Sequence, residues 1–169
     1  MTLAEASGIE RAAVERAYQR LFKITARRVA DRKEIRAMLI PFNERGEQIG
    51  QPMMLGNFEK EVWPKIHESA VAKPQAARVP AGDAFDAFVC ESWAAYTDHK
   101  PSDDFLPSEQ PDRKECVMFD FLGSDWQALA FCLIDRATNA LSNEELKFVG
   151  APGPMKWEGR FIRKQPTRQ

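Results

Sequence analysis

The sequence is poor in the residues and short motifs that most often signal catalysis. Its 169 residues include only two histidines, three cysteines and nine glycines. The cysteines, at positions 90, 116 and 132, are too far apart for a local pair of metal ligands. The glycines form neither a phosphate-binding loop nor a Gly-x-Ser-x-Gly nucleophile elbow. The sequence therefore gives no support for a zinc, nucleotide or acyl-transfer site, and we expect no metal and no cofactor.

Long apolar runs are lacking too. No segment approaches the ~18 consecutive apolar residues that a membrane-spanning helix needs. The first residues, MTLAEASGIER, lack the basic start and apolar centre of a signal peptide. Each cysteine lies inside an apolar stretch, which is typical of buried free thiols in a reducing compartment. We therefore expect a cytoplasmic protein that makes no membrane contact.

The charge is nearly balanced overall but is unevenly distributed along the chain. The net charge is −1, with +4 on residues 1–36, +4 on residues 156–169 and −9 on the residues between them. Two basic ends around an acidic middle fit an acidic partner, self-association or attraction within the chain. Solvated termini would produce the same pattern, so a protein partner or a second copy is one interpretation among several.

Two helices are predicted. The first covers about residues 7–30, with Ser7 as its N-cap and Glu10 completing a capping box. Its apolar residues recur at steps of three and four: Ile9, Ala13, Ala17, Leu21 and Ile24. The second covers about residues 57–72, and Pro64 should kink or split it.

The other segments predict strands. Residues 34–55 indicate a hairpin around the turn at 43–46, whose second strand is interrupted or at an edge because of Pro52. The remainder, 84–163, is rich in strands, and the two apolar arms around residues 122–125 are the strongest of them. Residues 164–169 should fray.

Together these elements predict the fold class. The strand links are of hairpin length, which favours an antiparallel sheet. We predict a single α+β domain over residues 1–169, with a mainly antiparallel sheet of about five to seven strands and two principal helices packed on one face.

The N-terminal stretch TLAEASGIERAAVERAYQRL resembles the helix-turn-helix of bacterial transcription regulators. Ala4, Gly8 and Val14 stand at that motif's usual spacing. The resemblance implies that the second helix would enter the DNA major groove and present basic side chains, namely Arg11, Arg16 and Arg20. We expect no supporting helices of such a domain ahead of Ala4, and a helix packed on a sheet would use the same apolar residues.

Residues 97–115 form a long polar segment with several carboxylates. Asp112 and Lys114 make an Asp-x-Lys pattern similar to that of PD-(D/E)xK nucleases, in which carboxylates hold a divalent cation and a lysine stabilises charge. Glu91 or Glu109 would supply the further carboxylate. The segment also holds Asp98, His99, Asp103 and Asp104, which fit neither an EF-hand loop nor a zinc site.

A second resemblance covers about thirty residues. It is to uncharacterised bacterial and phage proteins in which a Ser-Glu-Ala-Trp-like strand precedes a Pro-Ser-Glu-x-Pro-x-Arg-x-Glu-like loop. Residues 90–93 match the first part loosely, with Glu91 and Ser92 in reversed order, and residues 107–115 match the second part more closely. The resemblance implies a phage- or mobile-element-borne protein and a polar cluster of Glu91, Arg113 and Glu115, with no activity attached.

The candidate site is accordingly a polar cluster at the entrance to a strand. Its members are Glu91, Ser108, Glu109, Asp112, Arg113, Lys114 and Glu115, and the aromatic side chains that would line a binding surface beside it are Trp93 and Tyr96. Prolines on both sides of Ser108 stiffen this approach, which favours a structural clamp over a catalyst. We expect a non-enzymatic binding or accessory protein that acts through protein contacts. The alternatives are a divalent-metal-dependent nuclease or hydrolase using residues 97–115 and a DNA-binding regulator using the first helix.

Overall fold

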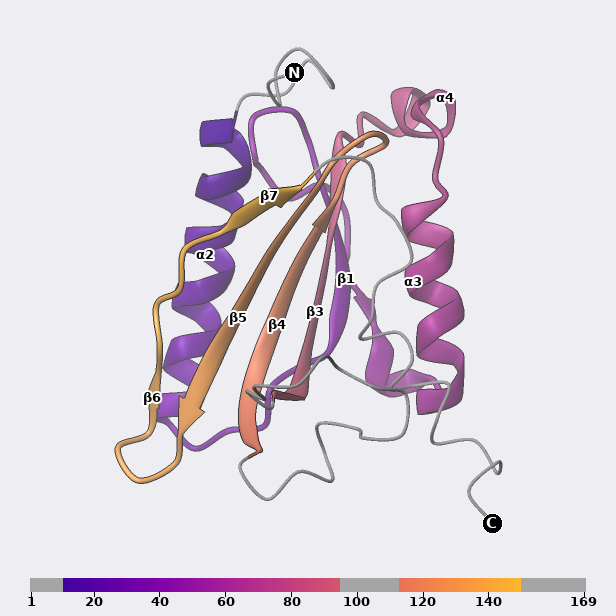
Figure 1. Cartoon of the computed structure of the whole chain (residues 1–169). Helices are drawn as coiled ribbons and strands as arrows, with labels where there is room; N and C mark the ends of the chain where they lie inside the picture. The colour runs from indigo at the N-terminus through magenta and orange to yellow at the C-terminus, as the bar shows by residue number, and fades with distance from the viewer. Residues whose placement is uncertain (1–10, 95–112, 150–169) are drawn as a thin grey trace.

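The computed structural model describes residues 11–94 and 113–149. A twisted antiparallel sheet of seven strands runs through the molecule in the order β2-β1-β3-β4-β5-β6, with β7 also paired to β5 (Figure 1). The strands are β1 (Met38–Phe42), β2 (Met53–Met54), β3 (Phe85–Ala94), β4 (Lys114–Leu122), β5 (Gln127–Asp135), β6 (Ala140–Leu141) and β7 (Lys147–Val149). The predicted α+β class and antiparallel sheet are confirmed.

The long helix α2 (Arg11–Ala30) covers one face of the sheet. Its buried stripe repeats at three- and four-residue steps, as the sequence predicts, and consists of Ala13, Val14, Ala17, Tyr18, Leu21, Thr25 and Val29. Tyr18 lies edge-on to Phe119 and Phe121 of β4, with ring centroids 5.4 and 6.1 Å away. These contacts place the larger hydrophobic core between α2 and the sheet.

The opposite face is covered by a segment of short helices. It contains the 3₁₀ turns η1 (Leu55–Asn57) and η2 (Lys60–Val62), the helices α3 (Trp63–Val71) and α4 (Gln75–Arg78), and the 3₁₀ turn η3 (Val79–Ala81). Leu55 of this segment forms a second apolar cluster with Phe88, Cys90 and Met118 of the sheet, and Trp63 and Ile66 pack against that cluster. The structure thus corrects one detail of the prediction, because the two principal helices lie on opposite faces of the sheet (Figure 1).

The reason for that correction is the two-residue alternation of side chains along a strand. In β3, Phe85, Ala87 and Val89 join the core under α2, whereas Phe88 and Cys90 join the cluster under α3. A nearly continuous apolar strand therefore needs cover on both faces.

Pro64 acts much as its position predicts. The expected helix over residues 57–72 is divided into the turns η1 and η2 and the helix α3, and Pro64 lies in the first turn of α3. A proline costs little there because the first amide groups of a helix have no partner within the helix.

The first hairpin is confirmed, with Met38 paired to Met54 and Leu39 to Met53. Asn43 Oδ1 accepts hydrogen bonds from the amides of Arg45 and Glu47 at 2.9 and 3.0 Å, which closes the predicted turn. Pro52 immediately precedes β2, the edge strand. The predicted Ser7 cap, the last part of the strand-rich region, over 150–163, and the tail 164–169 lie outside the described residues. Among the described helices, none has the length and apolar character to cross a bilayer.

Candidate functional site

The structure brings together part of the predicted polar cluster. Arg136, just after β5, donates hydrogen bonds to Glu91 Oε1 at 3.0 Å and to Glu115 Oε2 at 2.8 Å. Glu91 and Glu115 lie on neighbouring strands and on one face, because Glu91 pairs with Val117 and Glu115 with Trp93. The bridging cation is therefore Arg136, which the sequence analysis did not include. Arg113 lies exposed directly before β4.

The cluster is half open to solvent, with 40% of the Glu91 side chain and 47% of the Arg136 side chain exposed. Burial raises the pKa of Glu91 above its usual range, and the nearby guanidinium of Arg136 partly opposes that rise. Exposed pairs of this kind contribute at most about 1 kcal/mol each. The arrangement suits a clamp between β3, β4 and the end of β5.

The other predicted site residues are separated or lie outside the described residues. Lys114 pairs with Ala94, so the alternation of side chains puts it on the face opposite to Glu91 and Glu115. Asp112, Ser108, Glu109 and Tyr96 fall outside the described residues, while Trp93 lies in β3 opposite Glu115. Within 11–94 and 113–149, no three potential ligands from His, Cys, Asp and Glu gather as a metal site would require.

The residues of the helix-turn-helix resemblance lie on or before α2. Val14 is fully buried against the sheet, and Ala4 and Gly8 lie outside the described residues. Arg11, Arg16 and Arg20 are exposed on the outer side of α2. The helix that carries them is packed on the sheet along its length and does not project from it.

A layer of buried polar and charged side chains under α3 was not predicted from the sequence. His67 Nε2 and Asp120 Oδ2 are 2.7 Å apart, and Gln127 Nε2 donates to Asp120 Oδ1 at 2.9 Å. All three residues are 0–2% exposed. Burial raises the pKa of the Asp120 carboxyl, and the hydrogen bond from His67 works in the opposite direction.

A second part of this layer surrounds Arg78, which is completely buried at the end of α4. Its guanidinium lies 2.9 Å from Asp86 Oδ2 and 3.2 Å from Asp83 Oδ1, and it also donates to the carbonyl oxygen of Leu122 at 3.1 Å. Lys73 pairs with both carboxylates. Burial and the neighbouring Asp83 raise the pKa of Asp86.

One signal in the sequence points to these groups. Asp86 and Asp120 each interrupt an apolar strand, in FDAF and in MFDFL. A carboxylate at such a position must have a partner, because an isolated buried charge costs several kcal/mol. The partners His67 and Arg78 come from the helical segment. Both pairs are closed to solvent, so the geometry fits the anchoring of α3 and α4 to the sheet.

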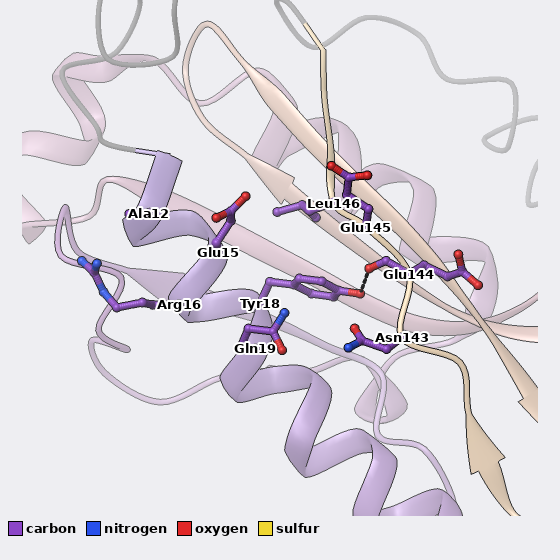
Figure 2. A pocket seen from close by; sticks show the side chains of 9 residues that line it. All are labelled: Ala12, Glu15, Arg16, Tyr18, Gln19, Asn143, Glu144, Glu145 and Leu146. Atoms are coloured by element: carbon purple, nitrogen blue, oxygen red, sulfur yellow. Dashed lines mark hydrogen bonds between the residues drawn. The ribbon is translucent and has the colours of Figure 1, made fainter.

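A groove lies between α2 and the chain that follows β6, with a volume of about 710 Å³ (Figure 2). Tyr18 crosses its floor and donates a hydrogen bond to the carbonyl oxygen of Glu144 at 2.6 Å; its hydroxyl also lies 3.3 Å from Cys132 Sγ. Burial raises the pKa of Tyr18, so the phenol stays protonated. The remaining lining residues are Ala12, Glu15, Arg16, Gln19, Asn143, Glu145 and Leu146.

A group of exposed apolar side chains lies in the segment that begins with β2, the strand at the other end of the sheet from β6. Met53, Phe58 and Val62 are 44%, 43% and 37% exposed and fall within ten residues of chain. We call residues 53–62 the edge segment. It contains β2, η1 and η2, and the indole of Trp63 fixes it by donating to the carbonyl oxygens of Leu55 and Phe58 at 2.8 and 3.3 Å.

No family model, no curated protein and no solved structure matches this chain. The function must therefore be argued from the geometry of the described residues.

Proposed function

We propose that the chain is a non-enzymatic binding protein that contacts another protein through its edge segment. The observation that carries this proposal is the exposure of Met53, Phe58 and Val62 within one ten-residue segment that begins with the edge strand β2. Exposed apolar side chains gathered in one place are typical of protein contact sites.

The edge segment is better suited to contact a partner through its side chains than through backbone hydrogen bonds. The edge strand β2 is only two residues long and follows Pro52, which has no amide hydrogen to donate. Addition of a partner strand is therefore disfavoured, and we expect Phe58 and its neighbours to enter an apolar pocket on the partner. The hydrogen bonds from Trp63 hold the segment in place, which reduces the entropy lost on binding.

The charged groups support this choice over catalysis. The pairs around Asp120 and Arg78 are enclosed, and Glu91 and Glu115 are already bridged by Arg136. The buried thiols of Cys90, Cys116 and Cys132 suit a reducing compartment, so we expect the contact to form in the cytoplasm.

The experiment compares the wild-type chain with the double variant Met53→Glu/Phe58→Glu. We expect the immobilised wild-type chain to retain a partner from an extract of its source cells, and the purified partner to bind the double variant at least about tenfold more weakly. Calorimetric titration measures that difference. Sedimentation velocity of the chain alone shows whether the partner is a second copy.

The control is Val79→Glu, which adds one negative charge at a 67% exposed valine outside the edge segment. It should bind as the wild type does. Equal binding by the double variant, or a monomer that retains no partner, would refute the proposal.

A further inference from the structure

The outer side of α2 carries a row of cations. Arg16, Arg20, Lys23 and Arg27 follow one another at steps of four, three and four residues, and all are exposed. At a rise of 1.5 Å per residue the row spans about 16 Å. Six cations against one carboxylate give α2 a net charge of +5, which leaves −6 on the rest of a chain whose total is −1.

Several of the cations on α2 have structural partners. Arg11 pairs with Glu15 at 3.1 Å and lies over the ring of Phe148. Arg28 donates to the carbonyl oxygen of Glu34 at 2.7 Å, and Arg16 to that of Arg45 at 2.9 Å.

The other three cations of α2 differ from these in their contacts. Within the described part of the chain, Arg20, Lys23 and Arg27 have no hydrogen bond or ion pair.

These three cations weaken the helix that carries them. Like charges three and four residues apart repel one another on the surface of a helix and so destabilise it. Arg27 lies in the last turn, where its positive charge interacts favourably with the C-terminal end of the helix dipole. Arg20 and Lys23 lie too far from that end to gain the same stabilisation. An external polyanion would remove the repulsion and would release counterions as it bound.

We propose that the outer side of α2 binds the phosphate backbone of double-stranded nucleic acid without reading its sequence. This surface is separate from the edge segment, so the inference goes beyond the proposed protein contact. The side chains in the row are long and mostly arginine, which matches phosphate oxygens with paired donors. Because α2 lies flat on the sheet, we expect its side chains to reach phosphates and not base edges.

An acidic protein is the competing partner, and the composition of the surface disfavours it. A protein interface usually has an apolar centre within a polar rim. Among the exposed large apolar side chains of the described residues, only Ile24 belongs to α2. A row of charge with a single apolar side chain suits a phosphate track better.

The test measures binding to two 20-base-pair DNA duplexes of unrelated sequence by fluorescence anisotropy over a range of salt concentrations. We expect equal affinity for both duplexes and a slope of log K against log salt of about −3 to −4, since each phosphate contact contributes about −0.9. The triple variant Arg20→Gln/Lys23→Gln/Arg27→Gln should bind each duplex at least about tenfold more weakly than the wild type does. Its slope of log K against log salt should be less negative than the wild-type slope by about 3.

The control is Lys65→Gln/Lys114→Gln/Lys147→Gln, which removes three exposed cations outside α2 and outside the edge segment and changes the net charge equally. It should bind as the wild type does. Absence of duplex binding, a flat salt dependence of the wild type, equal loss in both triple variants, or binding only to a polyglutamate peptide would overturn the proposal. The salt dependence of the wild type needs no variant, so a folding defect in either triple would not obscure the result.

Discussion

His67 Nε2 lies 2.7 Å from Asp120 Oδ2, and neither side chain is accessible to solvent. The pair joins α3 to the central strand β4 across 53 residues of sequence. Two effects on Asp120 oppose each other here: burial raises the pKa of its carboxyl, and the hydrogen bond from His67 lowers it. Burial has the larger effect, which gives the pair a measurable pH dependence.

Replacing Asp120 with Asn should remove part of the pH dependence of stability. The folded pKa of Asp120 lies above the unfolded value of about 3.9. Between those two values the folded chain holds a proton that the unfolded chain has released, so the free energy of unfolding falls as pH rises through this range. The contribution is fully present below the unfolded pKa and is lost above the folded pKa. Urea denaturation at a series of pH values should show this fall in the wild type and a smaller one in Asp120→Asn.

Asp31→Asn, at an exposed position after α2, is the control and should keep the wild-type slope. A stability difference between wild type and Asp120→Asn that grows with pH would show instead that the ion pair with His67 dominates.

Replacing Arg78 with Met should be strongly destabilising. The substitution keeps much of the side-chain volume but leaves Asp83 and Asp86 buried together with only Lys73 as a cation. Breaking a buried ion pair by removing one partner costs about 3–5 kcal/mol. Chemical denaturation measures the loss, and Arg45→Met, at an exposed turn position, should cost less than about 0.5 kcal/mol.

The triple variant Arg78→Met/Asp83→Asn/Asp86→Asn tests the reason for that loss. It should recover part of the stability, because the uncompensated carboxylates are gone. A loss below about 1 kcal/mol for Arg78→Met alone would mean that the charges around it are better solvated than their burial indicates.

Gly46 and Gly50 should respond differently to replacement by Ala. Both have positive φ, at 78° and 67°, so each substitution costs about 1–2 kcal/mol in backbone strain. At Gly46 the new Cβ would also lie 2.1 Å from the carbonyl oxygen of Ala13 in α2, whereas at Gly50 no atom lies within 4 Å. We expect Gly46→Ala to cost about 2 kcal/mol more than Gly50→Ala, because α2 must shift.

Thermal denaturation of the two glycine variants measures this difference, and amide hydrogen exchange should show faster exchange in α2 for Gly46→Ala alone. Equal losses would mean that the turn at 43–46 can move away from α2 without cost.

The elements that the sequence predicts well are those set by neighbouring residues. The stripe of Ala13, Ala17 and Leu21 defines α2 because residues three and four apart share a face of a helix. The turn at Asn43 and the break at Pro64 follow from local hydrogen bonding and from the missing proline amide. Each of these features depends on residues that lie close together in the sequence.

The candidate site was less predictable because its members come from distant segments. Glu91 and Glu115 could be named from the sequence, but their cation could not, because Arg136 reaches them only when β5 lies beside β4. The sequence pattern groups Lys114 with Glu91, yet the register of β3 and β4 puts the two side chains on opposite faces of the sheet. The pairing of His67 with Asp120 depends on where α3 crosses the sheet.

The sequence by itself determined the α+β class, the position of the long helix and the hairpins, since local periodicity and turn chemistry act over short stretches of chain. Only the tertiary structure decided that α2 and α3 cover opposite faces of the sheet and which polar side chains meet beneath α3 and α4. The physical reason is that a nearly continuous apolar strand must be covered on both faces of the sheet. Its sequence does not determine which segment of the chain covers each face. That choice depends on the packing of the whole chain, in which each buried carboxyl group must find its hydrogen-bonding partners.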